Sequence, residues 1–314
     1  MSLTTDESGD EDAAGPRHLL DIDDLSPAEV TEILDRATSL KTTQRAGNTH
    51  QFLAGQTLGM VFEKPSTRTR VSFETGMTQL GGHAVFLGPD DVGLGGREPA
   101  KDISRTLSRY VDAVMVRTFD HANVVEIAEY ATVPVVNGLT DAAHPCQTLA
   151  DLLTIRERFG DEARVAWVGD GNNVAQSFVV GAALAGLDLT VATPAEYGID
   201  DAVVERATDL GATPTVTDDP EAAVADADVV YTDVWVSMGQ EDQRAEKLAV
   251  FEDGGFQLNE SLLAGTDAAV MHCLPAHRGE EVTDTVIESE RSLVWEQAEN
   301  RLHAQKALLT WLLD

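Results

Sequence analysis

Short apolar runs rich in β-branched residues alternate with helical patterns from residue 57 onward. Each run has the length and composition of a strand, and the segment after it repeats its apolar positions at helical spacing. The first series predicts strands at residues 58–62, 84–87, 113–116 and 133–136, and helices near residues 69–80, 103–110 and 124–130. Because parallel strands require helical crossovers, this alternation predicts a parallel sheet flanked by helices.

A second series of the same kind begins after a predicted helix at residues 148–159. Its strands are expected at residues 164–168, 187–192, 214–216, 229–232 and 268–271. A last helix, at about residues 296–313, has Leu302, Leu308, Leu309 and Leu312 on or near one face. Since 314 residues with 43% apolar side chains can fill two cores, we predict an α/β protein with two domains, residues 17–150 and 151–295, and a cleft between them.

The N-terminal segment departs from this pattern. Residues 1–16 have hardly an apolar side chain and hold five acids, Asp6, Glu7, Asp10, Glu11 and Asp12. Burial cannot offset the entropy of ordering such a segment, so a disordered acidic tail is predicted. Ser26, Pro27 and Glu29 then have the order of a cap, a first-turn proline and an acidic first turn, which predicts a helix toward Leu40.

The formal net charge is −32, from 54 acidic and 22 basic residues. Such a charge excludes nucleic acid and anionic membrane surfaces as natural partners. Self-repulsion of this size destabilises a compact state unless salt screens it, so we expect adaptation to molar intracellular salt. An ordinary acidic cytosolic enzyme is the alternative interpretation.

Targeting and cysteine use point to the cytoplasm. No apolar run is long enough to cross a bilayer, and the N-terminus lacks the features of a secretory signal. The two cysteines lie far apart in sequence, so no disulfide framework is expected. A zinc site built from His144, Cys146, His272 and Cys273 would lack the usual ligand spacing, so neither a metal nor a cofactor is expected.

The segment Ser66-Thr67-Arg68-Thr69-Arg70 follows the first predicted strand and opens the next helix. It combines hydroxyls, guanidiniums and the unpaired amides of a helix N-terminus, which together suit the oxygens of a phosphate. The alternative is a capped helix with two solvated arginines. A phosphate-bearing substrate is the hypothesis that this turn favours.

The segment Gly169-Asp170-Gly171-Asn172-Asn173 follows a strand of the second series. It lacks the third glycine of a dinucleotide-binding fingerprint, so a nucleotide-dependent dehydrogenase is disfavoured. A tight turn that presents asparagine side chains at the carboxyl edge of the sheet is the better interpretation, and ligands of α/β proteins bind at that edge.

Four further motifs follow the Ser66–Arg70 turn in order: Arg117 at a strand end, His144-Pro145-Cys146-Gln147, Asp233-Val234-Trp235-Val236-Ser237-Met238-Gly239 and His272-Cys273-Leu274-Pro275. From about His18 onward the chain resembles the ornithine carbamoyltransferases. The resemblance implies transfer of the carbamoyl group between carbamoyl phosphate and the δ-amine of L-ornithine, giving L-citrulline and phosphate in arginine metabolism. It also implies a final helix that crosses back to the first domain, no cofactor, and a homotrimer or a multiple of trimers.

The resemblance also implies roles for the residues of the first domain. Ser66, Thr67, Arg68, Thr69 and Arg117 would hold the phosphate of carbamoyl phosphate, and Arg301 would reach it from the final helix. The developing oxyanion would be surrounded by Arg117, His144 and Thr69, while Gln147 would bind the carbamoyl amide. Because Pro145 disfavours helical backbone at the residue before it, we expect His144 to be extended and to direct its ring into the cleft.

For the second domain, the resemblance implies an ornithine site. Asn173 would bind the carboxylate end, Asp233 the α-ammonium, and Ser237 and Met238 would close over the pocket on a loop whose mobility Gly239 favours. Cys273, expected as a thiolate, and the carbonyl of Leu274 would lie beside the δ-amine and the carbamoyl group. Covalent catalysis by Cys273 stays open as an alternative.

One segment departs from the family pattern. Gly93 stands where many members have a glutamine that contacts carbamoyl phosphate, and Arg97 could compensate. Other acceptors are also considered: putrescine lacks the carboxylate that Asn173 would bind, and Asp233 would repel the second carboxylate of aspartate. A non-catalytic binding protein would be expected to lose Arg68, His144 or Cys273. The sequence leaves the biosynthetic and the fermentative direction open.

Overall fold

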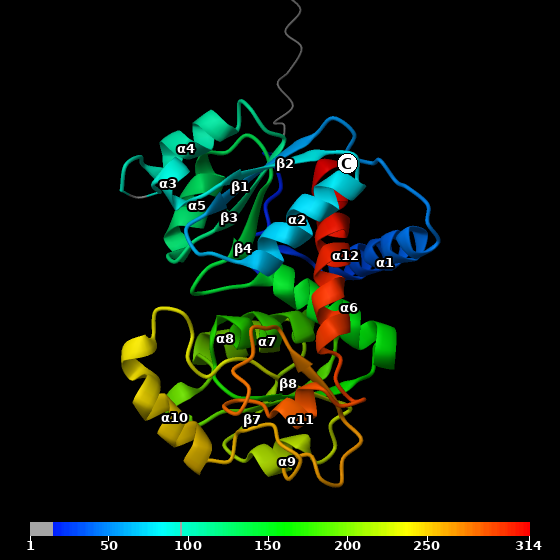
Figure 1. Cartoon of the computed structure of the whole chain (residues 1–314), viewed down its shortest axis with the longest axis vertical. Helices are drawn as coiled ribbons and strands as arrows, with labels where there is room; N and C mark the ends of the chain where they lie inside the picture. The colour runs from blue at the N-terminus through cyan, green and yellow to red at the C-terminus, as the bar shows by residue number, and fades with distance from the viewer. Residues whose placement is uncertain (1–14, 95) are drawn as a thin grey trace, which may run out of the picture.

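The computed structural model of the chain describes residues 15–94 and 96–314, which form two lobes (Figure 1). The upper lobe holds a parallel sheet of order β2-β1-β3-β4, with β1 at Thr57–Phe62, β2 at His83–Leu87, β3 at Ala113–Arg117 and β4 at Val135–Leu139. The lower lobe holds a parallel sheet of order β7-β6-β5-β8-β9, with β5 at Arg164–Val168, β6 at Asp188–Ala192, β7 at Thr215–Thr217, β8 at Val229–Thr232 and β9 at Ala269–His272. The predicted α/β fold with two parallel sheets is confirmed. The acidic tail predicted at residues 1–16 lies, through residue 14, outside the described residues.

The helices cover the sheets as their apolar faces require. In the upper lobe these are α2 (Thr67–Gln79), α3 (Pro89–Val92), α4 (Ala100–Leu107) and α5 (His121–Tyr130). In the lower lobe they are α7 (Asn173–Ala185), α8 (Asp201–Asp209), α9 (Pro220–Val224), α10 (Arg244–Asp253) and α11 (Asp284–Ile287), with 3-10 turns at Ala195–Tyr197 and Glu241–Gln243, and a further 3-10 turn, Ile22–Asp24, lies in the segment before the first helix. Five predicted helices, α2, α4, α5, α6 (Pro145–Phe159) and α12 (Val294–Leu313), begin two or three residues earlier than expected. For α2 and α5 the reason is a side-chain cap, from Ser66 and Asp120 respectively.

Strand boundaries were predicted less well where proline intervenes. The strand expected at residues 133–136 begins at Val135, and it continues to Leu139 with a register shift opposite Val116 and Arg117. Pro134 cannot donate to the ladder, although its carbonyl accepts the N–H of Val114 at 2.9 Å. Because β4 ends at Leu139 and not at residue 136, its carboxyl end lies near the start of α6 (Pro145–Phe159), beside the cleft.

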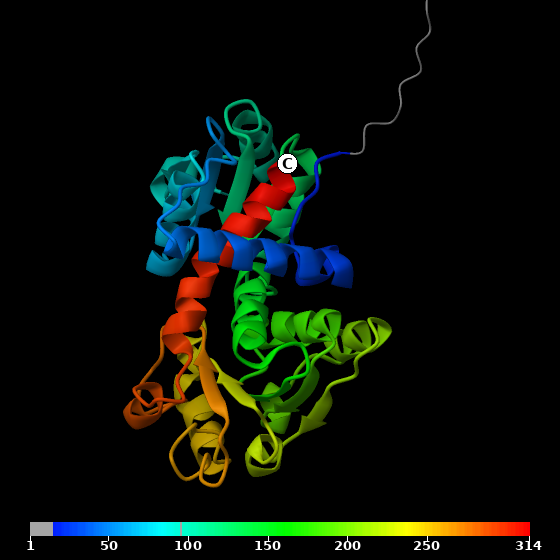
Figure 2. The same cartoon turned by 90° about the vertical axis from the view of Figure 1, so that its right-hand side faces the viewer.

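Two long helices, α6 (Pro145–Phe159) and α12 (Val294–Leu313), run between the lobes, and a third, α1 (Pro27–Arg45), packs across them (Figures 1 and 2). Helix α12 leaves the lower lobe and packs against α6, α1 and α2. Its Asn300 accepts a hydrogen bond from the buried Lys41 of α1 at 2.6 Å and donates to Thr154 of α6 at 3.0 Å. The final helix therefore crosses back to the upper lobe, as expected.

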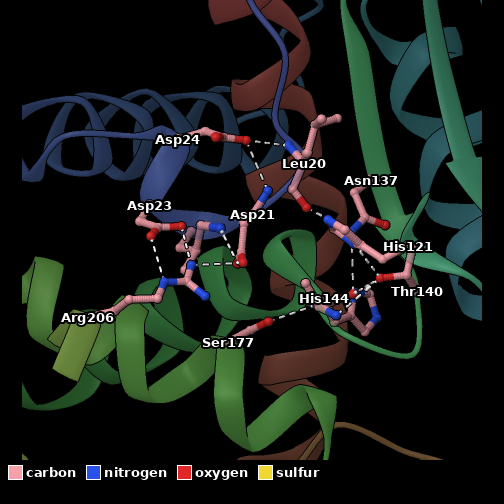
Figure 3. Close-up of polar contacts among 12 residues, drawn as sticks. Leu20, Asp21, Asp23, Asp24, His121, Asn137, Thr140, His144, Ser177 and Arg206 are labelled. Atoms are coloured by element: carbon pink, nitrogen blue, oxygen red, sulfur yellow. Dashed lines mark hydrogen bonds and ion pairs between the residues drawn. The ribbon is translucent and has the colours of Figure 1, made fainter. Parts of the chain in front are cut away.

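The segment before α1 also joins the lobes (Figure 3). Leu19 pairs with the edge of β4, because its N–H donates to Val135 and its carbonyl accepts from Asn137. Two residues on, Asp21 and Asp23 accept from Arg206 of α8 at 2.9 and 2.5 Å. Among the described residues, no helix is both long and apolar enough to span a membrane.

Candidate active site

The turn between β1 and α2 presents a helix N-terminus to the space between the lobes. Ser66 is the N-cap of α2, and its hydroxyl accepts the Thr69 N–H at 3.2 Å. Arg68 lines the cleft, whereas Arg70 turns away, donates to Glu74 at 2.9 Å and lies over the ring of Phe86 at 3.9 Å. Of the two guanidiniums in the motif, only that of Arg68 is placed to meet an anion in the cleft.

The cleft between the lobes has a volume of about 930 Å³. Nearly every predicted site residue lines it: Ser66, Thr67, Arg68, Arg117, His144, Gln147, Asn173, Asp233, Ser237, Met238, Cys273, Leu274 and Arg301. Thr69 is the exception, because it is fully buried behind the wall and its hydroxyl accepts from Arg301 at 2.9 Å. The structure thus brings together side chains that are more than 200 residues apart in sequence.

One wall of the cleft concentrates positive charge. Arg117 at the end of β3 and Arg301 on α12 are 5% and 3% exposed, and in the described part of the chain the Nε atom of each has no hydrogen-bond partner. Burial, and then the neighbouring Arg301 and Arg68, lower the pKa of Arg117 to about 9. Neighbouring buried cations that repel one another and have no carboxylate partner are suited to a multiply charged anion.

His144 lies at the N-terminus of α6 beside this wall. Its backbone N–H donates to the Ser177 hydroxyl of α7 at 2.8 Å (Figure 3), and its φ of −138° and ψ of 63° are not helical. Pro145 thus keeps the residue out of the helix as predicted, but ψ falls short of extended backbone. Burial, and then Arg301, Arg117 and Arg68, lower the pKa of His144 well below its ordinary value. The imidazole is therefore neutral and can donate one hydrogen bond into the cleft.

A buried carboxylate supports this wall from behind. The Oδ1 atom of Asp151 on α6 accepts from Gln147 at 2.8 Å and from Gln297 at 2.7 Å, and its Oδ2 accepts from Tyr231 at 2.9 Å. Gln147 in turn accepts from Arg301 at 3.0 Å. Burial raises the pKa of Asp151 to about 7, although its three donors oppose the rise. Sequence reasoning missed Asp151, whose signal was a lone acid between apolar residues of a predicted helix.

The opposite wall carries the negative charge. The Asp233 carboxylate, 5% exposed, accepts from Asn172 Nδ2 at Oδ2 and from Cys273 Sγ at Oδ1, both at 2.9 Å. Burial and then Asp233 raise the pKa of Cys273 well above its ordinary value. The expectation of a thiolate at Cys273 is therefore wrong, because a buried sulfur beside a carboxylate keeps its proton.

The lower-lobe residues expected to bind ornithine include Asn173, which is held by a contact with the upper lobe, and Met238, which lies at the rim of the cleft. Asn173 Nδ2 donates to the carbonyl of Thr140 in the upper lobe at 2.6 Å, and the Thr140 hydroxyl contacts His121 Nδ1 at 2.9 Å (Figure 3). Met238 is half exposed at the rim of the cleft, and Gly239 after it has a φ of 94°. A backbone with this φ strongly favours glycine, so the turn after Met238 depends on Gly239.

Two buried lysines near the cleft were not predicted as site residues. Lys64 pairs with Asp141 and lies 4.3 Å from the ring centroid of Phe119. Lys247 of α10 donates to Asp170 at 2.8 Å and to Gln240 at 3.0 Å. Because Asp170 follows β5 and Gln240 follows the Ser237–Gly239 loop, Lys247 connects that loop to the turn after β5.

The loop at Gly93 and Arg97, which differs from the family pattern, contributes none of its described residues to the lining of the cleft. Gly93 ends α3 with a φ of 61°, and a Cβ there would lie 2.9 Å from the Cβ of Arg97. Arg97 donates to the carbonyl of Asp91, and neither Gly93 nor Arg97 is among the described residues that line the cleft. A glutamine at position 93 would be strained in this backbone.

The zinc alternative finds little support. In the described ranges, side-chain ligand atoms lie within 4.8 Å of one another in two groups, Asp233-His272-Cys273 and His277-Glu280-Glu281. His144 and Cys146 belong to neither group, and burial raises the pKa of the Cys146 thiol to about 12. Cys273 donates to Asp233 and both nitrogens of His272 have protein partners, so the first group is satisfied without a metal.

Fold and site together define a two-domain α/β protein whose interdomain cleft has a cationic wall and an acidic wall. Residues 17–157 match the family model described as aspartate/ornithine carbamoyltransferase, carbamoyl-P binding domain, and residues 161–312 match the Asp/Orn binding domain of the same family. The chain belongs to the aspartate/ornithine carbamoyltransferase family.

Individual relatives agree over nearly the whole chain. It is 67% identical to ornithine carbamoyltransferase of Haloquadratum walsbyi, over 95% of this chain and 98% of that one. It is 54% identical to the enzyme of the same name from Methanoculleus marisnigri, over 95% and 97% of the two chains. The solved structure of ornithine carbamoyltransferase from Pyrococcus furiosus superposes with a TM-score of 0.90 at 50% identity, covering 94% of this chain and 96% of that one.

Proposed function

We propose that the protein transfers the carbamoyl group between carbamoyl phosphate and the δ-amine of L-ornithine, giving L-citrulline and phosphate. The observation that carries this proposal is the division of the cleft into two walls. The guanidinium groups of Arg68, Arg117 and Arg301 line the cleft beside neutral His144, and the Asp233 carboxylate lies on the other wall. A dianionic leaving group and a cationic amino acid need these opposite environments.

Carbamoyl phosphate is assigned to the upper lobe. Its phosphate is held by the α2 N-terminus at Ser66, Thr67 and Arg68, with Arg117 and Arg301, while Thr69 positions Arg301 from behind the wall. Arg117 and neutral His144 donate to the carbonyl oxygen, where negative charge develops as the amine attacks. Gln147 binds the carbamoyl amide, and Asp151 holds the Gln147 side chain in orientation through the 2.8 Å bond. Residues 17–150 and the helix at 296–314 form this domain.

Ornithine is assigned to the lower lobe, residues 151–295. Asp233 pairs with the α-ammonium, Asn173 binds the carboxylate end, and Ser237 and Met238 cover the pocket when their loop closes. Cys273 and the Leu274 carbonyl lie beside the δ-amine. Putrescine has no carboxylate to occupy Asn173, and a second carboxylate on aspartate would be repelled by Asp233, so ornithine fits best.

Direct attack by the amine accounts for these groups without an acyl-enzyme. The δ-ammonium must first lose its proton, since only the neutral amine is a nucleophile. Cys273, as a thiol that donates to Asp233, is a poor nucleophile and acts by orienting the amine. Formation and phosphorolysis of citrulline pass through the same transition state, so the site serves arginine metabolism in either direction.

The charge and the family also carry proposals about the protein's surroundings. We propose that the protein works in the cytoplasm of a salt-adapted cell, because a net charge of −32 requires screening by salt. The resemblance to the family supports a homotrimer or a multiple of trimers. The melting temperature should rise between dilute buffer and molar KCl, and an unchanged value would remove the salt-adapted interpretation. Light scattering in molar KCl should give a trimer or a multiple, and a monomer would contradict the assembly.

The test of the reaction is citrulline formation from carbamoyl phosphate and L-ornithine in molar KCl, with putrescine and aspartate as parallel acceptors. We expect product with ornithine alone. The Asp233→Asn variant should raise the KM for ornithine and leave the KM for carbamoyl phosphate nearly unchanged, because the two substrates contact different walls. Folded protein that carbamoylates none of the three acceptors would refute the proposal.

A further inference from the structure

Both ring nitrogens of His272 are engaged by the protein at the edge of the cleft. His272 ends β9 immediately before Cys273, and its Nδ1 accepts the backbone N–H of Leu274 at 2.8 Å. Its Nε2 lies 3.1 Å from Oε1 of Glu281. Both side chains are fully buried, and neither lines the cleft in the described chain.

The Leu274 contact shows which tautomer this histidine adopts. A backbone N–H can only donate, so Nδ1 must present a lone pair and the ring proton must be on Nε2. That proton then points at Oε1 of Glu281, which accepts it. Glu281 therefore selects the tautomer, and its Oε1 is itself held by the N–H of His277 at 2.5 Å.

Leu274 is a residue that needs such a constraint. Its φ is 61°, and among the described residues it is the one non-glycine residue with a positive φ. A leucine rarely adopts this left-handed conformation without support from its surroundings. The backbone N–H of His272 donates to Gln297 Oε1 on α12 at 2.9 Å, so the ring that holds Leu274 is itself anchored to the final helix.

We propose that His272 and Glu281 are positioning residues that hold Cys273 and Leu274 in the geometry that receives the amine of the second substrate. The pair acts through the peptide between Cys273 and Leu274, whose N–H it fixes. This inference rests on the proposed function, in which the Cys273 sulfur and the Leu274 carbonyl orient the attacking amine.

Two substitutions at position 272 separate the hydrogen bond from the packing of the ring. His272→Leu removes the acceptor, whereas His272→Asn restores one, because an asparagine side chain accepts the N–H two residues ahead in an Asx turn. We expect His272→Leu to lower kcat/KM for ornithine by about ten- to a hundredfold, as small misplacements of reacting groups do, with the KM for carbamoyl phosphate within about twofold of wild type. His272→Asn should recover most of the loss.

A matched pair at Glu281 tests the selection of the tautomer. Glu281→Gln keeps an oxygen that accepts from both His272 and His277, so its ornithine kinetics should stay close to those of wild type. Glu281→Leu removes the acceptor and allows the other tautomer, so it should lose activity as His272→Leu does. This pair also carries the test if a substitution at His272 prevents folding.

Crystal structures of His272→Leu and His272→Asn give a readout that does not depend on activity. We expect Leu274 to leave the left-handed region in the leucine variant and to remain there in the asparagine variant. A positive φ at Leu274 in both would overturn the inference, as would equal kinetic losses in both variants or unchanged ornithine kinetics in His272→Leu. If folded wild-type protein makes no citrulline, the proposed function fails while the structural comparison still decides the role of the pair.

Discussion

The Lys247–Asp170 pair offers a sharp test of how this acidic protein holds the turn after β5. Their side chains are 3% and 6% exposed and 2.8 Å apart. At an effective dielectric constant near 20, the attraction at this distance is about 6 kcal/mol, part of which offsets the cost of removing both charges from water. Lys247→Met leaves the carboxylate buried without its cation, so we expect the free energy of unfolding to fall by about 3 to 5 kcal/mol near neutral pH.

The loss should depend on pH in a defined direction. Burial, opposed by Lys247, raises the pKa of Asp170 from 3.8 to about 6. A carboxyl whose pKa is higher in the folded than in the unfolded state destabilises the fold as pH rises between the two values. Without Lys247 the folded-state pKa rises further, so the difference between variant and wild type should widen above pH 6 and narrow toward pH 4.

The assay is urea unfolding in molar KCl, followed by tryptophan fluorescence at fixed protein concentration and several pH values. Because the pair is buried, salt should screen it little. Lys247→Met/Asp170→Asn is the control, and it should recover much of the loss because no unpaired charge stays buried. A Lys247→Met protein with the wild-type urea midpoint near pH 7 would refute this reasoning.

Three further outcomes are expected. Arg117→Leu should lower turnover in steady-state kinetics by about a hundred- to a thousandfold. Arg70→Leu removes a guanidinium that faces away from the cleft and should leave turnover nearly unchanged. Similar losses in the two variants would contradict the role assigned to Arg117. Cys273→Ser keeps a donor for Asp233, so the variant should retain measurable turnover. Mass spectra of the wild-type protein during turnover should show no carbamoyl adduct, and a trapped adduct would instead establish covalent catalysis. Turnover should rise from neutral to alkaline pH as the δ-amine deprotonates, and a flat profile with chemistry rate-limiting would exclude attack by the free amine.

The local pattern of the chain determined most of the secondary structure and the motifs. The strands at Arg164–Val168 and Val229–Thr232 have the predicted boundaries, because each is a buried apolar run ended by turn residues. The Ser66 cap and the hydroxyl-rich first turn of α2 were also predictable, since capping depends on neighbours three residues apart. Where a proline alters hydrogen bonding, as before Val135, the boundary was missed.

Tertiary structure decided which of these groups meet and in which protonation state. Arg301 reaches Thr69 only because α12 crosses between the lobes, and no local pattern encodes a contact across 232 residues. The thiol at Cys273, the neutral His144 and the buried Asp151 follow from burial and from charges on distant elements, which shift a pKa only once the chain is folded. Sequence by itself therefore determined the chemical groups of the site, whereas their separation, desolvation and charge depend on packing between the lobes.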